Sequence, residues 1–345
     1  EMIRSGVEAK AKEMGGRAIL SEALLEEVTA LVEWPVPVAG RFEERFLELP
    51  REVLISTLQD HQRYFAVEDA TGRLLTAFIT VSNIESREPA QVRTGNERVV
   101  RPRLSDAAFF WQQDRREPLA ARLAGLDAVT FQAKLGSLGA KVKRIESISE
   151  TISARLNWNV LQAQRSAALA KCDLLTAMVG EFPELQGIMG SYYATADGEP
   201  AVVAQAIREH YLPRGAGDAL PQSAPGTAVA LADRLDTLAG IFAIGQKPTG
   251  TKDPFGLRRA AIGVLRILIE KRIDLDLRAL TDTAVALQPV KSAKAADEVY
   301  EYISERLRAY YLEQPGMTYT TEMIDAVLAT APRSPQPEPA PCNTT

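Results

Sequence analysis

Cysteine and histidine are scarce in this chain of 345 residues, which contains two of each. Cys172 and Cys342 lie far apart and neither begins a Cys-x-x-Cys pair. This excludes a disulfide framework and a cysteine-rich zinc site, and it favours a reducing compartment, the cytoplasm. A two-histidine metal site would require the fold to bring His61 and His210 together. Long apolar runs are also missing. None approaches the ~18 residues of a membrane span, because charges interrupt even residues 229–243.

The charge balance excludes both a disordered chain and a strongly basic one. The 40 Lys and Arg residues face 45 Asp and Glu residues, which gives a formal net charge of −5, and 46% of the residues are hydrophobic. That mixture is typical of a globular protein with a large core. The length predicts about two or three domains. The chain begins with Glu1 rather than Met, so we expect it to be a piece of a longer protein.

The N-terminal part combines helical and strand patterns. Apolar residues at helical spacing predict helix across residues 1–33, with Ser21 capping the second run and prolines ending it. Aromatic and β-branched runs around a short Asp/Gly turn predict a β-hairpin near residues 62–82. Residues 46–55 fit either a strand or a short helix. We therefore expect a partial α+β domain over residues 1–125.

From about residue 96 the pattern is mostly helical, so the predicted fold class is α+β with helices predominating. Pro102 is expected to interrupt the start of this region. The predicted helices span residues 141–180 (two helices broken near 157–159), 201–211, 228–245, 256–272, 277–287 and 295–312. Turn residues predict a bend at 180–190 and loops at 212–226 and 246–254. Five prolines within residues 331–345 predict a disordered tail.

Positive charge is concentrated in residues 247–272, which hold seven basic and two acidic side chains, a net charge of +5. Such a local patch suits a polyanion. The preceding Gly245–Asp253 segment partly matches a phosphate-binding loop. However, Thr251 separates Lys252 from Gly250, and Asp253 would repel a phosphate. The segment is more typical of a helix–helix connector or an anion-contact loop. The candidate contacts with a polyanion are Lys247, Lys252, Arg258 and Arg259.

A second basic segment, residues 93–122, has seven basic and four acidic side chains, and its next candidates are Arg101 and Arg103. It contains the aromatic run Phe109, Phe110 and Trp111, whose rings could stack on the bases of single-stranded nucleic acid. Three consecutive rings on a helix point in different directions. We therefore expect at least two of them to lie in the core.

Nucleophile motifs are missing. The sequence has no Gly-x-Ser-x-Gly and no cysteine beside a histidine, and we predict no catalytic residue. His61 is expected to be a hydrogen-bonded residue at the start of a strand, and His210 a surface or helix-end residue. Asp233 and Asp236 lie on an otherwise apolar helix, where a carboxylate must be paired or ligating, and Asp173 poses the same question.

Several long stretches carry a resemblance that single motifs do not. They read LISTLQDHQRYFAV (54–67), DAAFFWQQD (106–114), FQAKLGSL (131–138), KCDLLTAMVGEFPELQGIMG (171–190) and ALADRLDTLAGIFAIGQKPTGTKDPFGLRR (230–259), with VSNI, GNE and RPRL elements between 81 and 104. Together they resemble the β subunit of the bacterial heterotetrameric (α2β2) glycyl-tRNA synthetase. The resemblance covers residues 1–330 and leaves out the proline-rich tail.

The resemblance implies a subunit of a glycine–tRNA ligase. In that family the α subunit holds the active site and uses ATP and Mg to make glycyl-adenylate. The β subunit binds tRNA(Gly) and docks on the α subunit. It implies no cofactor bound by this chain, and an α2β2 assembly for the full-length protein. Family β chains continue on both sides of the matched region, so we expect an internal fragment or an incomplete gene product.

The middle of the family resembles the HD-domain fold, whose metal-dependent members use a His-Asp pair with further His and Asp ligands. Here Cys172 and Asp173 fill the doublet position and Asp233 corresponds to the distal aspartate. The resemblance thus implies a degenerate HD-like domain over residues 126–275, followed at 276–330 by the start of a C-terminal helical region. Two aspartates and one thiol do not make a metal site. We predict no bound metal, and expect the aspartates to pair with Lys171 or Arg234.

Two alternatives to a tRNA-binding subunit stay open. One is an HD-type metal-dependent phosphohydrolase, which the missing histidines disfavour. The other is a purely structural subunit that makes no contact with tRNA.

Overall fold

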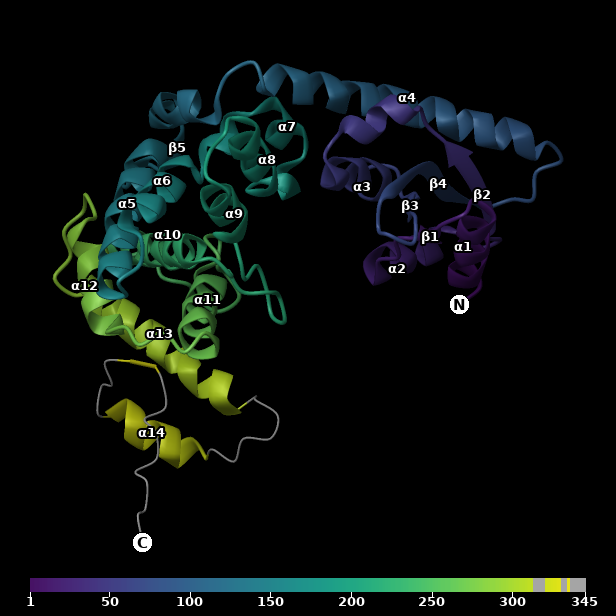
Figure 1. Cartoon of the computed structure of the whole chain (residues 1–345). Coiled ribbons are helices and arrows are strands. Elements are labelled where there is room, and N and C mark those ends of the chain that lie inside the picture. The colour runs from purple at the N-terminus through teal and green to yellow at the C-terminus, as the bar shows by residue number, and fades with distance from the viewer. Residues whose placement is uncertain (313–319, 330–333, 336–345) are drawn as a thin grey trace, which may run out of the picture. The chain divides into compact units, whose positions relative to one another are not determined.

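The computed structural model describes residues 1–312, 320–329 and 334–335 (Figure 1). The chain divides into two compact units. Unit 1 comprises residues 1–116 and 176–185, and unit 2 comprises residues 117–175 together with the chain from Gln186 onward. The sequence places a boundary near residue 125 and does not anticipate the return of residues 176–185 to unit 1. The predicted domain limits stay predictions.

Unit 1 contains a four-stranded antiparallel sheet with the order β1-β3-β4-β2. Its strands are β1 (Arg17–Ala18), β2 (Val36–Arg41), β3 (Phe65–Glu68) and β4 (Leu74–Ser82). The predicted hairpin is confirmed as β3 and β4, which pair in antiparallel register. In the turn, Asp69 accepts hydrogen bonds from the backbone N–H groups of Thr71 and Arg73. Gly72 adopts φ +83°, which a glycine tolerates without steric cost.

Strand β2 was not predicted, because Pro37 lies inside it. It is an edge strand, paired with β4 alone. A proline is tolerated there because one side of an edge strand donates no ladder hydrogen bond. Gly40 of this strand lies opposite Phe78, and an added Cβ would come 2.4 Å from the ring. A larger residue at position 40 would therefore clash with the Phe78 ring.

The helices of unit 1 pack on the sheet and around it. They are α1 (Met2–Glu13), α2 (Glu22–Leu31), η1 (Glu44–Glu48), α3 (Arg51–Gln59), α4 (Pro89–Asp114), α7 (Ala177–Glu181) and η4 (Pro183–Leu185). Apolar faces of α1 and α2 form one core with β3 and β4. The Ser21 side chain accepts from Leu24 N at 3.4 Å, as the capping prediction requires. Residues 46–48 lie in η1 and residues 51–55 in α3, so the helical alternative left open above is confirmed for this segment.

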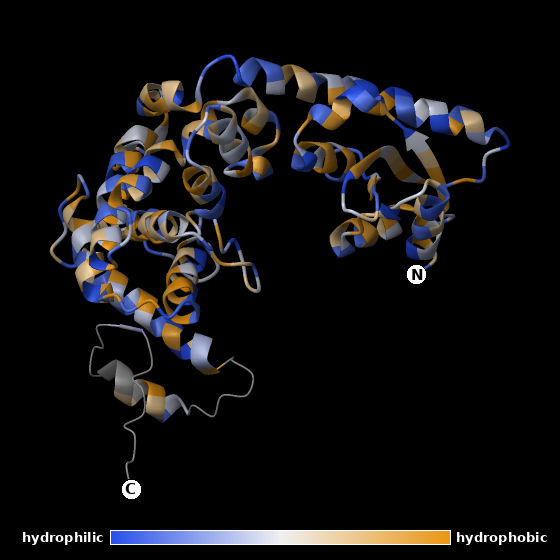
Figure 2. Cartoon of the chain, in the orientation of Figure 1, coloured by the Kyte–Doolittle hydropathy of each residue, from blue (hydrophilic) through white to orange (hydrophobic). Residues whose placement is uncertain are grey.

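Helix α4 runs through Pro102 without a break, so the predicted interruption is wrong. Pro102 removes one backbone donor and crowds the carbonyl one turn earlier. It lies on the exposed face of the helix, where water can solvate that carbonyl. The opposite face is anchored by Val100, Leu104 and Ala107, all of which are buried. Figure 2 shows α4 with several hydrophilic stretches along its length.

Unit 2 is almost entirely helical. Its elements are η2 (Leu119–Ala128), β5 (Thr130–Gln132), β6 (Gly136–Ser137), α5 (Leu138–Arg155), α6 (Val160–Leu169), η3 (Cys172–Leu175), α8 (Ile188–Ala196), α9 (Ala201–Glu209), α10 (Ala224–Ala243), α11 (Leu257–Glu270), α12 (Leu277–Ala286), α13 (Ala295–Leu312) and α14 (Thr321–Ala329). Helix α10 lies at the centre and contacts α5, α6, α9, α11, α12 and α13. Because it is surrounded, 15 of its 20 residues are buried and none is exposed.

Most predicted helices of this unit are confirmed. The break near 157–159 occurs where Asn157 adopts φ +54° and the Asn159 side chain caps α6. The helix expected to continue to residue 180 is instead divided into α6, η3 and α7. Helix α8 was not predicted and begins inside the expected bend. The predicted tail, residues 331–345, lies outside the described residues apart from 334–335. Among the residues that are described, no helix is both long and apolar enough to cross a membrane.

Candidate functional site

Helix α10 presents polar side chains to a core that is otherwise apolar. Asp236 is fully buried. Its carboxylate accepts from Arg144 Nε at 2.5 Å, from Lys141 Nζ at 3.0 Å and from Gln288 Nε2 at 3.0 Å. A buried charge is tolerated only when it is paired and hydrogen-bonded. The prediction that this carboxylate is paired or ligating is confirmed, and its charged partners are the two cations of α5.

Asp233, one turn earlier, lies between two lysines. Lys141 Nζ is 2.8 Å from Oδ1 and Lys171 Nζ is 2.7 Å from Oδ2. Burial alone would raise the pKa of this carboxyl, but the two ammonium groups outweigh it and hold the pKa well below its usual value. The expected pairing with Lys171 is confirmed. Arg234 makes no ion pair with a carboxylate in the part of the chain that the structure describes, so the alternative pairing is wrong.

His210 follows the last residue of α9 and is fully buried. The prediction of a helix-end residue is confirmed. The prediction of a surface residue is wrong, because the Tyr211 ring packs on the imidazole, with ring centroids 3.9 Å apart, and the Lys171 side chain contacts the imidazole at Nε2. Nδ1 donates to the carbonyl of Ile207 at 2.6 Å, and Nε2 accepts from Lys171 Nζ at 2.9 Å. Burial, reinforced by the Lys171 charge, holds the pKa of His210 well below its usual value. The imidazole is therefore neutral.

Cys172 and Asp173, the predicted remnant of a metal-binding doublet, have structural contacts instead. Burial raises the pKa of the Cys172 thiol to about 12, so it is not a thiolate ligand at neutral pH. The Asp173 carboxylate accepts from the backbone N–H groups of Gly187 at 2.5 Å and Gly190 at 3.0 Å. Burial raises its pKa to about 6.

The negative charge of Asp233 is therefore compensated by two lysine side chains. Lys141 and Lys171 supply the positive charge that a cation would otherwise bring to this carboxylate. In the part of the chain that the structure describes, no group of three or more His, Cys, Asp or Glu side chains is arranged to hold a metal ion. The two lysines thus pair this carboxylate within the fold.

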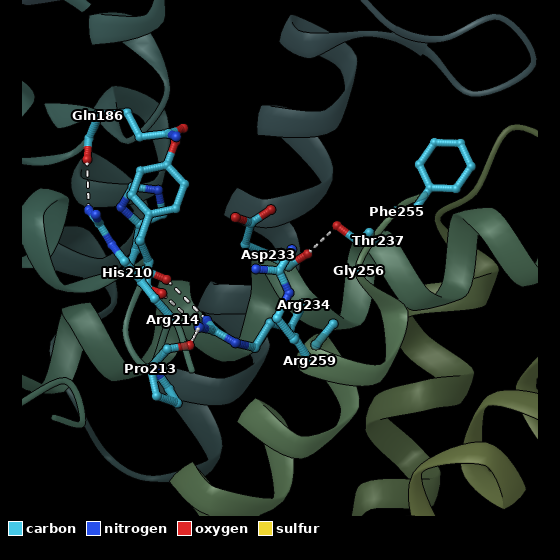
Figure 3. A pocket seen from close by; sticks show the side chains of 12 residues that line it. Gln186, His210, Pro213, Arg214, Asp233, Arg234, Thr237, Phe255, Gly256 and Arg259 are labelled. Carbon is cyan, nitrogen blue, oxygen red and sulfur yellow. Dashed lines mark hydrogen bonds between the residues drawn. The ribbon is translucent and has the colours of Figure 1, made fainter. Parts of the chain in front are cut away.

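A cavity of about 350 Å³ opens beside this cluster (Figure 3). It is lined by α10, the start of α11 with the two residues before it, the loop after α9, and Gln186 before α8: Gln186, His210, Tyr211, Pro213, Arg214, Asp233, Arg234, Thr237, Phe255, Gly256, Arg259 and Ala260. Three of the twelve are arginines and one is a carboxylate. The cavity thus combines an excess of guanidinium groups with two aromatic walls.

The loop between α10 and α11 is a helix connector with exposed basic side chains. The Asp253 carboxylate accepts from Leu257 N at 2.8 Å and Arg258 N at 2.9 Å, so it occupies the N-terminus of α11. A phosphate cannot use those donors, which excludes a phosphate-binding loop of the usual kind. Thr249 and Lys252 pair across the turn. Asp253, the residue that disfavours a phosphate loop in the sequence, therefore caps the N-terminus of α11.

The six basic candidates fall into two groups. Lys247, Lys252, Arg258 and Arg259 share the α10–α11 connector and the start of α11 in unit 2, whereas Arg101 and Arg103 lie on α4 in unit 1. Lys247 Nζ is 2.7 Å from Glu298 and Arg101 Nε is 2.7 Å from Glu43, so both charges are partly offset. Arg258 donates to the carbonyl of Gly250.

Arg103 lines a small hollow in unit 1 together with His61, whose ring stacks on Phe182 with centroids 4.8 Å apart. The neighbouring aromatic run is more exposed than expected. Phe109 is 57% exposed, and Phe110 and Trp111 are half-buried. The prediction that at least two of these rings lie in the core is wrong, because the core side of α4 is occupied by the smaller residues described above.

Sequence reasoning missed Lys141, Arg144 and Gln288, which complete the charge cluster. A signal was present for the first two. They lie three residues apart beside the apolar residues Val142 and Ile145 of the same helix, so they share its buried side. No such signal marks Gln288, which reaches Asp236 from 52 residues away along the chain.

Comparisons with known proteins converge on one description. The sequence model of a family described as "Glycyl-tRNA synthetase beta subunit" matches residues 1–329. A glycine–tRNA ligase beta subunit of Ectopseudomonas mendocina is 55% identical over 337 residues, which is 97% of this chain and 49% of that protein. Those of Stutzerimonas stutzeri and Pseudomonas aeruginosa are 55% and 52% identical over 91% and 97% of this chain. The chain spans about half the length of these relatives.

Proposed function

The chain belongs to the glycyl-tRNA synthetase beta subunit family, and from that premise we propose that it binds tRNA(Gly) and docks on a catalytic α subunit to support glycylation. The observation that carries the proposal is the family-model match over residues 1–329, together with relatives that are 52–55% identical over nearly the whole chain. In this proposal ATP and Mg act in the α subunit, and this chain binds neither. The assembly is α2β2 in the full-length protein and works in the cytoplasm, where tRNA is charged.

The distribution of charge supports a tRNA contact at the α10–α11 connector. RNA helices are recognised mainly through their shape and their phosphates, so exposed Lys and Arg side chains suffice. Lys252 and Arg259 are exposed and form no ion pair or hydrogen bond through their side chains with any described residue. The charge of Lys247, by contrast, is offset by Glu298. We therefore rank Lys252 and Arg259 above Lys247 and Arg101 as phosphate contacts.

Unit 2 is, in the same proposal, a degenerate HD-like domain that has lost its metal. The lysines on either side of Asp233, the neutral His210 and the neutral Cys172 support this assignment. A phosphohydrolase would need a metal-activated water. We expect no release of phosphate from nucleotides in the presence of Mn²⁺, and turnover above the rate of a heat-denatured sample would favour the phosphohydrolase alternative.

Charge reversal tests the tRNA contact. We expect Lys252→Glu combined with Arg259→Glu to weaken retention of labelled tRNA(Gly) in a low-salt filter assay by about tenfold or more, because each phosphate contact adds to affinity. Lys12→Glu, an exposed lysine of α1 in unit 1, is the matched control and should leave retention unchanged. Equal retention by the double variant and the control would exclude this contact.

Docking on the α subunit needs a separate measurement, because a purely structural subunit would dock without binding tRNA. Co-elution of this chain with an α subunit in size-exclusion chromatography, with no retention of tRNA by the chain alone, would support the structural alternative. Retention of tRNA by the chain alone supports the proposal.

A further inference from the structure

The cavity of unit 2 contains a half-buried positive charge that forms no ion pair with a described carboxylate. Arg234 lies in its wall, and burial lowers the pKa of its guanidinium to about 10. The guanidinium donates only to backbone carbonyls, those of His210 (3.1 Å), Ala230 (2.8 Å), Tyr211 (2.9 Å) and Pro213 (2.9 Å). These bonds fix the position of the group but leave its charge intact, so the wall attracts an anion.

Arg259 adds a second guanidinium, whose donors are available. The side chain lies over Gly256, where an added Cβ would come 3.2 Å from Nη2. Gly256 adopts φ +64°, a conformation that favours glycine. The missing side chain leaves room for the guanidinium against the backbone at the cavity wall (Figure 3). Within the described ranges of the chain, no hydrogen bond or ion pair occupies this group.

The carboxylate in the cavity does not cancel this charge, because Asp233 is shared between Lys141 and Lys171. Cations outnumber carboxylates two to one over the cavity and the adjoining cluster. The cations are Lys141, Arg144, Lys171, Arg214, Arg234 and Arg259, and the carboxylates are Asp173, Asp233 and Asp236.

We propose that this cavity binds the phosphate monoester of a nucleotide, with Arg259 donating to the phosphate oxygens and Arg234 supplying fixed positive charge behind them. A planar guanidinium matches two phosphate oxygens at once. The volume of about 350 Å³ exceeds what a phosphate alone fills and lies within the range of small-molecule sites. Phe255 and Tyr211 supply apolar walls for the nucleoside. Figure 3 shows Phe255 across the cavity from His210.

Two sources carry this group, a free nucleoside 5′-monophosphate and the 5′ end of an RNA chain. The inference goes beyond the tRNA contact proposed above, because a free nucleotide would bind whether or not the connector contacts tRNA. It rests on Arg234, Arg259 and the cavity, and does not need Lys252.

Isothermal titration of the full chain tests the proposal in two arms. One arm compares adenosine 5′-monophosphate with adenosine. The other compares a 5′-phosphorylated oligoribonucleotide with its 5′-hydroxyl counterpart. In at least one arm the phosphorylated member should bind about tenfold tighter or more, which is the usual worth of a charge-assisted hydrogen bond. The arm that shows the preference identifies the source.

Arg259→Gln should abolish this preference, whereas Lys12→Gln, on α1 of unit 1 and outside the cavity, should retain it. The Arg259 side chain is exposed, so its replacement should leave the helical circular dichroism unchanged. Equal binding of phosphorylated and unphosphorylated members in both arms would overturn the proposal. So would a preference that survives Arg259→Gln. Loss of tRNA retention in the double charge reversal with no phosphate preference would support the tRNA contact and refute this site alone.

Discussion

Replacing Asp236 with asparagine is expected to destabilise unit 2 strongly, although the two side chains have nearly the same shape. The carboxylate is fully buried and accepts from Arg144, Lys141 and Gln288. An asparagine presents one oxygen instead of two and carries no charge. Arg144 and Lys141, which are also buried, would then lose their shared counter-ion.

The size of the stability loss depends on which partners Lys141 and Arg144 keep after the substitution. Removing one partner of a buried ion pair costs about 3–5 kcal/mol, because the remaining charge stays desolvated. Lys141 keeps its ion pair with Asp233 at 2.8 Å, so part of that cost is avoided. Arg144 keeps only its hydrogen bond to the carbonyl of Leu135 at 3.3 Å. We therefore expect a loss at the lower end of the range, about 3 kcal/mol.

Urea unfolding followed by the fluorescence of Trp158 measures this loss. Trp158 packs against the core of unit 2, whereas Trp34 and Trp111 belong to unit 1 and can be replaced by phenylalanine. The matched control is Asp297→Asn, which breaks the exposed pair with Arg278 and should cost less than about 1 kcal/mol.

An equal loss in Asp236→Asn and the control would refute the claim that buried charge pairing holds this core together. A double-mutant cycle with Arg144→Met adds a second condition. The double variant should be at least about 1 kcal/mol more stable than the sum of the single losses predicts, because both residues belong to one network. Additive losses would contradict the network.

Three further predictions follow from the burial of single groups. Because the folded pKa of His210 is lowered, the unfolded chain binds the proton first, so stability is full above the unfolded pKa and is lost as pH falls. Lowering the pH from about 7.5 to about 6 therefore reduces the free energy of unfolding by ~0.8 kcal/mol. His210→Asn should remove this loss in urea unfolding, and a wild-type slope in the variant would contradict it; the raised pKa of Asp173 acts in the opposite direction in both proteins. In a Cys342→Ser variant, Cys172, with a pKa of about 12, should react with a thiol reagent only after unfolding, and rapid labelling of the native variant would exclude its burial. Gly40→Ala should destabilise unit 1 by about 1–3 kcal/mol because the new methyl meets the Phe78 ring, and an unchanged urea midpoint would show that the ring can move aside.

The elements that sequence patterns predicted well are those whose signal is local. The hairpin of β3 and β4 has its turn residues beside its strands, and α10 and α11 have long periodic or apolar runs between glycine-rich loops. Strand β2 and the unbroken α4 were missed because proline normally ends such elements. Here the edge position of Pro37 and the exposed face of Pro102 remove the penalty. Both conditions depend on distant parts of the chain.

In the candidate site, too, local features could be predicted from the sequence and long-range contacts could not. The need for a partner to Asp233 and Asp236 could be predicted, because a carboxylate on a buried helix cannot stay unpaired. The identity of most partners could not be predicted, since Lys141 and Arg144 reach α10 across more than 90 residues of sequence. His210 was predicted to lie at the surface or at a helix end, and its burial depends on the packing of Tyr211 and of Lys171, which is 39 residues away in the sequence.

The salt dependence of tRNA(Gly) binding by the full chain tests the central claim most directly. The logarithm of the binding constant falls with the logarithm of salt concentration by about 0.7–0.9 for each phosphate contact. We predict that the Lys252→Glu and Arg259→Glu double variant has a slope shallower than that of the wild-type chain by about 1.4–1.8, while Lys12→Glu keeps the wild-type slope. Identical slopes in all three proteins, or no binding of tRNA(Gly) by the wild-type chain at low salt, would contradict the account.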